Sequence, residues 1–271
     1  FFNNMLDSNL LDFPKLESMN SFHAQFDVII LAMNPNRLKS EESLDGNSES
    51  YLKNCFDIIK TFGVNQKRIV FLSSCVLYGE STDNSDEDSP TISDTCKGEY
   101  KDTATALLAV EKRLKEKCES ISVPFCIARV ASVYGVSGSG VIIEGVIPDL
   151  IIKFLKNTKE SVYISGSAAS SRNFIHIDDV VYIVFLISTS LDYISGIYNI
   201  CANSNTKLED LARGVSKLVG NTDFYFKLET ISSIRLIQSK RNNIKKFKKI
   251  TLRQGIKSMV KTLERNLYAN I

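Results

Sequence analysis

The feature that most constrains the fold is a short apolar run at residues 68–72 that ends in two serines. The run, RIVFL, carries β-branched and aromatic residues without the polar alternation of a half-exposed strand. This composition predicts a strand buried on both faces, as in a parallel sheet covered by helices. Ser73 and Ser74 then lie at the carboxyl end of the strand, where open α/β sheets bind their ligands.

A second periodic pattern predicts an amphipathic helix at residues 103–117. Charged residues occupy one face of this helix, and the other face carries Ala106, Leu107, Val110 and Leu114. With 271 residues, the chain is long enough for one large domain or two closely packed ones. We therefore expect an α/β protein with a full hydrophobic core.

Composition argues against several other classes of protein. No apolar run is long enough to span a bilayer, and the chain does not open with a signal peptide, so we expect a cytoplasmic protein without a membrane partner. The formal net charge of +2 gives no reason to expect a nucleic-acid partner. The six cysteines lack a C-x-x-C spacing and the chain has only two histidines, so we predict neither a metal site nor a disulfide framework.

Six segments, in order along the chain, resemble the NAD-dependent epimerase/dehydratase family, the extended short-chain dehydrogenases. They are residues 26–36, 73–79, 128–135, 171–181, 196–212 and 251–263. The resemblance implies a Rossmann-like, doubly wound parallel sheet with a small α/β substrate domain. It assigns dinucleotide binding to residues 1–135 and 175–200, and substrate binding to residues 136–174 and 201–271.

The start of the chain departs from the family pattern. A complete member opens with a strand, a glycine-rich turn and a helix that binds the cofactor pyrophosphate. Here the first glycine is Gly46, so we expect an N-terminally truncated member in which the first strands and that turn are missing. If this polypeptide is all there is, tight dinucleotide binding is not expected. Residues 9–16 resemble the adenine-side segment, which implies that Asn9 and Leu10 contact NAD or NADP together with Ala32 and Ser73.

The chemistry of the family uses a serine, a tyrosine and a lysine. The tyrosinate removes a hydroxyl proton while hydride passes to the nicotinamide, and the lysine lowers the pKa of the tyrosine. Ser74 matches the serine and is expected to hydrogen-bond the reacting oxygen. Glu111 stands 18 residues before Arg129, which suits the family spacing between the helix glutamate and the arginine of the next strand.

The tyrosine and lysine are not both present in either register of the helix. Counting back from Glu111, the two positions fall on Thr103 and Leu107. In the alternative register Tyr100 is the catalytic tyrosine, but Ala104 then stands at the lysine position. Residues 86–95 and 239–243 resemble an atypical branch, related to bacterial YeeZ-like proteins, whose members lack the Tyr/Lys pair.

The substrate half implies a small-molecule ligand, most simply a nucleotide sugar. Arg172 matches the family arginine that contacts a diphosphate, and Arg235 is a candidate for a second one. Ser132 stands where these enzymes have a substrate-touching asparagine, and His176 is expected to tie a strand to a helix. The family also implies a homodimer formed through helix 103–117, unless that apolar face packs on the sheet.

Two functions follow from these observations. The first is an NAD(P)-dependent epimerase, dehydratase or reductase that acts on a nucleotide sugar or a similar hydroxyl-bearing metabolite, with Ser74 and Tyr100 in the chemistry. The alternative is a non-catalytic or degenerate relative that binds a nucleotide or a partner chain without turnover.

Overall fold

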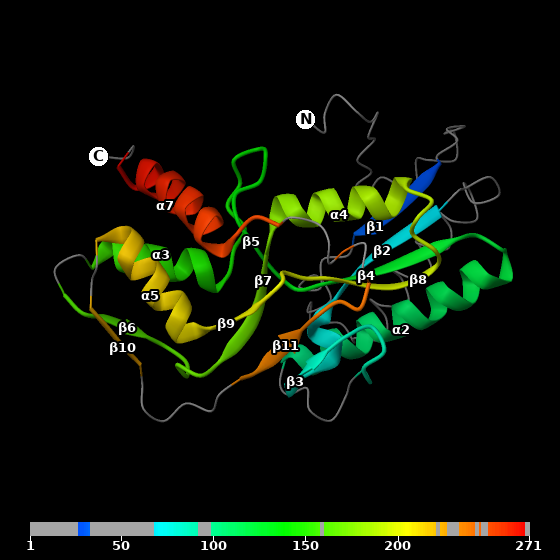
Figure 1. Cartoon of the computed structure of the whole chain (residues 1–271), viewed down its shortest axis with the longest axis horizontal. Coiled ribbons are helices and arrows are strands. Elements are labelled where there is room, and N and C mark those ends of the chain that lie inside the picture. Colours follow the sequence, from blue (N-terminus) through cyan, green and yellow to red (C-terminus); the bar gives the residue numbers. More distant parts are fainter. Residues whose placement is uncertain are drawn as a thin grey trace, which may run out of the picture.

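A four-stranded parallel sheet forms one half of the molecule (Figure 1). The computed structural model describes residues 27–32, 68–91, 99–157, 160–220, 223–226, 233–241, 244 and 249–268. Within these residues the strand order is β1-β2-β4-β8, and neighbouring strands pair in parallel, so their carboxyl ends share one edge. The strands are β1 (Val28–Ala32), β2 (Arg68–Ser74), β4 (Phe125–Val130) and β8 (Gly196–Ile200).

Helices cover both faces of this sheet, as the apolar run of β2 predicts. Ile69 and Phe71 pack in one buried cluster with Leu107, whereas Val70 packs in another with Ile183. Successive residues of a strand point to opposite faces, so each face of the sheet gains its own core. This arrangement confirms the predicted α/β class. The two helices are α2 (Glu99–Ser120) and α4 (Ile177–Thr189).

The apolar face of α2 packs on the sheet. Leu107, Val110 and Leu114 are each at most 1% exposed and lie in one cluster with strand residues such as Ile127. The structure thus favours the sheet-packing alternative for this face, and the homodimer stays a prediction. The predicted helix is confirmed and is longer at both ends than its periodic core.

The second half of the molecule is a smaller α/β layer. A three-stranded sheet of order β5-β7-β9 adjoins a parallel pair, β6 with β10, and three helices pack against them in a common core (Figure 1). The division of the chain into two binding regions stays a prediction. These elements are β5 (Ser132–Tyr134), α3 (Val146–Lys156), β6 (Val162–Ile164), β7 (Ser171–His176), β9 (Asn205–Lys207), α5 (Leu208–Val219), β10 (Phe224–Phe226) and α7 (Leu252–Tyr268).

Three short segments join the halves near the carboxyl edge of the large sheet. A 3₁₀ turn, η5 (Cys75–Tyr78), follows β2 directly. The strands β3 (Ser81–Ser85) and β11 (Arg235–Ile237) then pair in parallel, although about 150 residues separate them in the sequence. Because Ile234, the residue before β11, bridges to Ser171 of β7, this pair lies between the two halves.

Arg68 fixes the carboxyl end of α4. Its guanidinium donates to the carbonyl oxygens of Ile187, Ser190 at 2.9 Å and Tyr193 at 2.6 Å, and the residue is only 9% exposed. The last carbonyls of a helix have no partner within the helix, and the helix dipole favours a cation there. The side chain that begins β2 therefore satisfies the end of the helix packed on it.

His176 ties β7 to α4, as predicted. Its Nδ1 accepts from the Asp178 backbone N–H at 3.2 Å, and its ring lies edge-on to Tyr134. Two glycines make room for this pair. A Cβ on Gly135, at φ +121°, would lie 2.6 Å from His176 Nε2, and one on Gly255 would lie 2.6 Å from the Tyr134 ring. Only glycine fits such close approaches.

Within the described ranges, no helix is long and apolar enough to cross a membrane.

Candidate functional site

The carboxyl edge of the parallel sheet carries three of the predicted site residues. Ala32 ends β1, and Ser73 and Ser74 end the adjacent β2 in a register that pairs Ala32 with Leu72. The structure therefore places them at the ends of neighbouring strands, where parallel sheets bind ligands. The other two predicted cofactor residues, Asn9 and Leu10, lie outside the described residues.

Ser73 is engaged in a buried polar network. Its hydroxyl donates to Glu111 Oε1 at 2.6 Å, and Arg129 holds the same carboxylate through Nε at 3.1 Å and Nη2 at 2.6 Å. The Glu111 and Arg129 side chains are only 5% and 4% exposed. Glu111 and Arg129, 18 residues apart in the sequence, thus form a buried ion pair that joins α2 to β4.

Ser74 is better placed for a ligand. Its Oγ accepts from the Val76 backbone N–H at 3.2 Å and begins the 3₁₀ turn, and the residue is only partly buried. Among the residues that the structure describes, the Ser74 hydroxyl hydrogen has no acceptor. This hydrogen could therefore bind the oxygen of a substrate, as its assigned role requires.

The helix does not supply the tyrosine and lysine of the family mechanism. Thr103 is 9% exposed and Leu107 is fully buried, so both equivalent positions belong to the core of α2. Tyr100 lies in the first turn of α2, and Ala104, four residues further, is also fully buried. In neither register does a lysine stand four residues after the tyrosine position.

Tyr78 is near the site but cannot replace the missing tyrosine. Its hydroxyl accepts from Arg129 Nη1 at 3.0 Å and donates to Asn199 Oδ1 at 2.7 Å. Burial raises the pKa of Tyr78 well above its ordinary value, and the lowering by Arg129 does not compensate. A phenol with a raised pKa stays protonated at neutral pH, so Tyr78 joins η5 to β4 and β8 rather than removing a proton.

Cys75 is a structural thiol. It is 2% exposed, and its Sγ lies 3.2 Å from the Arg129 carbonyl oxygen. Burial, with a smaller contribution from Cys201, raises its pKa well above the ordinary thiol value. A thiol that stays protonated is a poor nucleophile.

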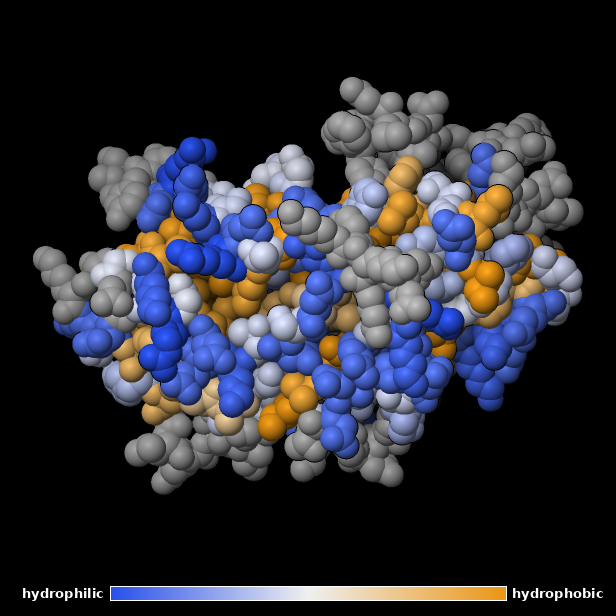
Figure 2. Space-filling model, viewed as in Figure 1, coloured by the Kyte–Doolittle hydropathy of each residue, from blue (hydrophilic) through white to orange (hydrophobic). Residues whose placement is uncertain are grey.

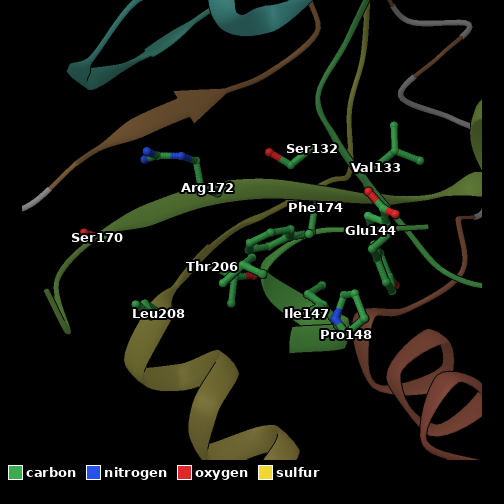
Figure 3. Close-up of a pocket in the computed structure, with 13 residues that line it drawn as sticks. Ser132, Val133, Glu144, Ile147, Pro148, Ser170, Arg172, Phe174, Thr206 and Leu208 are labelled. Carbon is green, nitrogen blue, oxygen red and sulfur yellow. The ribbon is translucent and has the colours of Figure 1, made fainter. Parts of the chain in front are cut away.

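A pocket of about 460 Å³ lies in the smaller layer and brings together two predicted substrate residues, Ser132 and Arg172 (Figure 3). Parallel pairing of β5 with β7 sets Ser132 opposite Phe174, two residues along β7 from Arg172. Figure 3 shows the two polar side chains on one side, with Thr206 and Leu208 across from them. In Figure 2, apolar surface is visible in the hollow between α5 and β7.

The Arg172 guanidinium is half-buried and donates to oxygens of Ser171 and Ser233. Its Nη1 donates to the Ser233 carbonyl oxygen at 2.6 Å and to the Ser171 carbonyl oxygen at 2.9 Å, and Nη2 donates to Ser233 Oγ. Ser233 Oγ in turn donates to Glu80. A guanidinium is planar and positively charged, which suits it to the oxygens of an anion.

Arg235 does not line this pocket. Its Nε donates to the Gly79 carbonyl oxygen at 3.0 Å, which joins β11 to the end of η5. Of the two predicted diphosphate arginines, Arg172 therefore lines the pocket, whereas Arg235 joins β11 to the end of η5.

The sequence did not indicate several residues that complete the pocket. They come from the turn before α3, the first turn of α3, β9 and the start of α5: Glu144, Gly145, Val146, Ile147, Pro148, Thr206 and Leu208. These residues carry no motif, and only their positions around β7 identify them. Among the described residues, no group of three or more His, Cys, Asp or Glu could hold a metal ion.

Comparison with known proteins agrees with this geometry. The sequence profile described as "NAD dependent epimerase/dehydratase family" matches residues 4–201. A search of curated proteins finds no match.

Solved structures share the fold at low sequence identity. An epimerase from Methanothermobacter thermautotrophicus is 16% identical, with a TM-score of 0.74 over 97% of this chain and 79% of its own. UDP-glucose 4-epimerase from Thermus thermophilus, in complex with NAD, is 17% identical, with a TM-score of 0.71 over 92% and 80%. UDP-N-acetylglucosamine 4-epimerase from Methanobrevibacter ruminantium, in complex with UDP-N-acetylmuramic acid, is 20% identical, with a TM-score of 0.70 over 89% and 77%.

Proposed function

The chain belongs to the NAD-dependent epimerase/dehydratase family, and on that premise we propose that it binds a nucleotide sugar or a similar hydroxyl-bearing metabolite in the pocket of Ser132 and Arg172. The observation that carries this proposal is the meeting of an arginine, a serine hydroxyl and apolar walls in one cavity. We propose the reaction class of the family, an NAD(P)-dependent epimerisation, dehydration or reduction.

The pocket suits such a ligand in size and chemistry. Its volume of about 460 Å³ falls within the range of small-molecule sites. Arg172 brings a positive charge that suits the oxygens of a diphosphate, while Phe174 and Pro148 offer apolar surface to the rest of a nucleotide. The UDP-N-acetylmuramic acid complex of the epimerase from Methanobrevibacter ruminantium supports the same class of ligand.

The cofactor proposal is NAD or NADP, bound through Asn9, Leu10, Ala32 and Ser73. The NAD complex of a structural neighbour supports it. The described part of this site does not by itself fit a dinucleotide, because Ala32 has no polar side chain and the Ser73 hydroxyl donates to Glu111. We therefore derive no reaction step through the cofactor.

The chain's own residues support a division of roles. Arg172 holds the anionic part of the substrate, Ser132 and Ser74 hydrogen-bond its hydroxyl or carbonyl oxygens, and Tyr100 is the candidate acid or base. The buried pair of Glu111 and Arg129 keeps the end of β2 in place beneath these groups.

A second function is favoured by one specific observation. The family tyrosine and lysine positions hold Thr103 and Leu107, and both are buried in the core of α2. A tyrosinate near neutral pH needs a cation beside it, and neither register places a lysine four residues after the tyrosine position, one helical turn away. The second candidate is therefore a relative that binds a nucleotide sugar, another nucleotide or a partner chain without turnover.

Substitution of Arg172 tests the binding site. Arg172→Ala is expected to weaken UDP-glucose binding by about 1.5 to 3 kcal/mol, since it removes charged hydrogen bonds to the diphosphate. Isothermal titration calorimetry measures the change. Arg253→Ala is the matched control, because Arg253 is exposed on α7 and does not line the pocket. Equal affinities for Arg172→Ala and the unmodified chain would remove Arg172 from the site.

Turnover separates the two candidate functions. If the chain is an enzyme, Ser74→Ala and Tyr100→Phe are each expected to lower the rate of sugar conversion by about a hundredfold, because each removes a proton-transfer group. Chromatography of the products after incubation with UDP-glucose and NAD or NADP measures the rate. Nucleotide-sugar binding without conversion by the unmodified chain would support the second candidate, and full activity of both variants would refute these assignments.

A further inference from the structure

The paired strands β3 and β11 carry a buried carboxylate that the function above does not use. Glu87 follows β3 and is 7% exposed. Its Oε1 accepts from the Asn199 backbone N–H at 2.9 Å and from Ser239 Oγ at 2.6 Å, and its Oε2 accepts from the Lys240 backbone N–H at 2.7 Å. One carboxylate thus joins the turn after β3, the end of β8 and the segment after β11.

This carboxylate connects two sequence motifs that resemble the same branch of the family. Glu87 lies in the segment DEDSPTISDT, and Ser239 and Lys240 begin the segment SKRNN. Lys240 Nζ also lies 3.3 Å from Asp86 and 3.0 Å from Asp88, but these contacts are more exposed. A buried carboxylate with three donors stabilises a structure more than exposed ion pairs do. Glu87 therefore contributes more than Asp86 or Asp88 to holding these three segments together.

Strand β11 connects the segments that Glu87 joins to the pocket that Arg172 lines. The Gln238 backbone N–H donates to the Ser85 carbonyl oxygen at 2.9 Å, which keeps β11 beside β3. At the other end of β11, Ser233 receives the Arg172 guanidinium on its carbonyl oxygen at 2.6 Å, and Ile234 bridges to Ser171. The position of β11 therefore decides where the Arg172 guanidinium lies.

We propose that Glu87 is a positioning residue for the anion-binding pocket. Its carboxylate binds Ser239 and Lys240 and so sets the position of β11. Ser233, which lies just before β11, then holds the Arg172 guanidinium toward the ligand. The inference rests on the proposed function, since it concerns the affinity of the same pocket for a nucleoside diphosphate.

Glu87→Gln tests the inference with little change of shape. The amide group is expected to set N–H donors against the N–H groups of Asn199 or Lys240 and so release the segment after β11. We expect UDP to bind about tenfold more weakly by calorimetry, and the amides of residues 235–241 to exchange faster while those of β2 and β4 do not. Asp88→Asn is the matched control and is expected to bind UDP as the unmodified chain does.

The outcomes are distinguishable from failure of the proposed function. Faster exchange at residues 235–241 with unchanged UDP affinity would overturn the inference and leave the pocket assignment intact. UDP affinity that Arg172→Ala does not alter would overturn the pocket assignment and the inference with it. If Glu87→Gln fails to fold, Ser239→Ala removes only one of the three hydrogen bonds; a several-fold loss of UDP affinity would support the inference, and no loss would refute it.

Discussion

Replacing Glu111 by glutamine is expected to lower the free energy of unfolding by about 3 to 5 kcal/mol, because Arg129 would remain buried without a counter-charge. The two side chains are 5% and 4% exposed, and their closest approach is 2.6 Å. The substitution also weakens the acceptor that satisfies the Ser73 hydroxyl. Urea unfolding followed by circular dichroism measures the difference.

Two further variants separate charge from packing in that experiment. Glu119→Gln is the matched control, since Glu119 pairs with Lys115 at 4.0 Å on the exposed side of the same helix, and we expect about 0.5 kcal/mol or less. The double variant Glu111→Leu with Arg129→Leu is expected to recover much of the loss, because it buries no lone charge. A loss below about 1 kcal/mol for Glu111→Gln would contradict the stabilising role of the pair.

Arg68→Met is expected to lower the free energy of unfolding by about 3 kcal/mol and the melting temperature by roughly 6 to 12 °C. Methionine replaces the apolar stem of the side chain but leaves the carbonyl oxygens of Ile187, Ser190 and Tyr193 without their donor. Differential scanning fluorimetry measures the shift.

The matched control for this change is Arg253→Met, which removes an exposed arginine from α7. It is expected to shift the melting temperature by about 2 °C or less. An equally small shift for Arg68→Met would show that water satisfies the end of α4 as well as the guanidinium does. Arg68→Lys is expected to fall between the two, because an ammonium retains the charge but reaches fewer of the carbonyls.

Sequence alone was sufficient for the elements whose signal is local. The apolar run of β2 predicted a strand buried on both faces, and the structure places Val70 and Phe71 in opposite cores. The helical spacing of Leu107 and Leu114 predicted the buried face of α2 in the same way. Such patterns depend only on the period of the backbone, so they hold whatever the rest of the chain does.

The candidate site was predictable only in part. Sequence motifs identified Ser132 and Arg172, and the structure places both on one pocket, whereas Glu144, Thr206 and Leu208 are recognisable only as its walls. Roles that depend on a free hydroxyl group were harder to predict from the sequence. The resemblance assigns Ser73 to the cofactor and Ser74 to the chemistry, but only the structure shows that the Ser73 hydroxyl donates to a buried carboxylate and that the Ser74 hydroxyl does not.

The sequence by itself determined the family, the strand and helix patterns, and the loss of the tyrosine and lysine pair from α2. Only the tertiary structure decided that Arg172 is held by Ser233, 61 residues away, and that Glu87 joins segments 112 and 152 residues distant. The physical reason is that burial repeats with the local backbone period, while a hydrogen-bond partner depends on which distant segments pack together. Composition and spacing therefore indicate which residues are buried. Only the folded chain brings together the groups that form the hydrogen bonds.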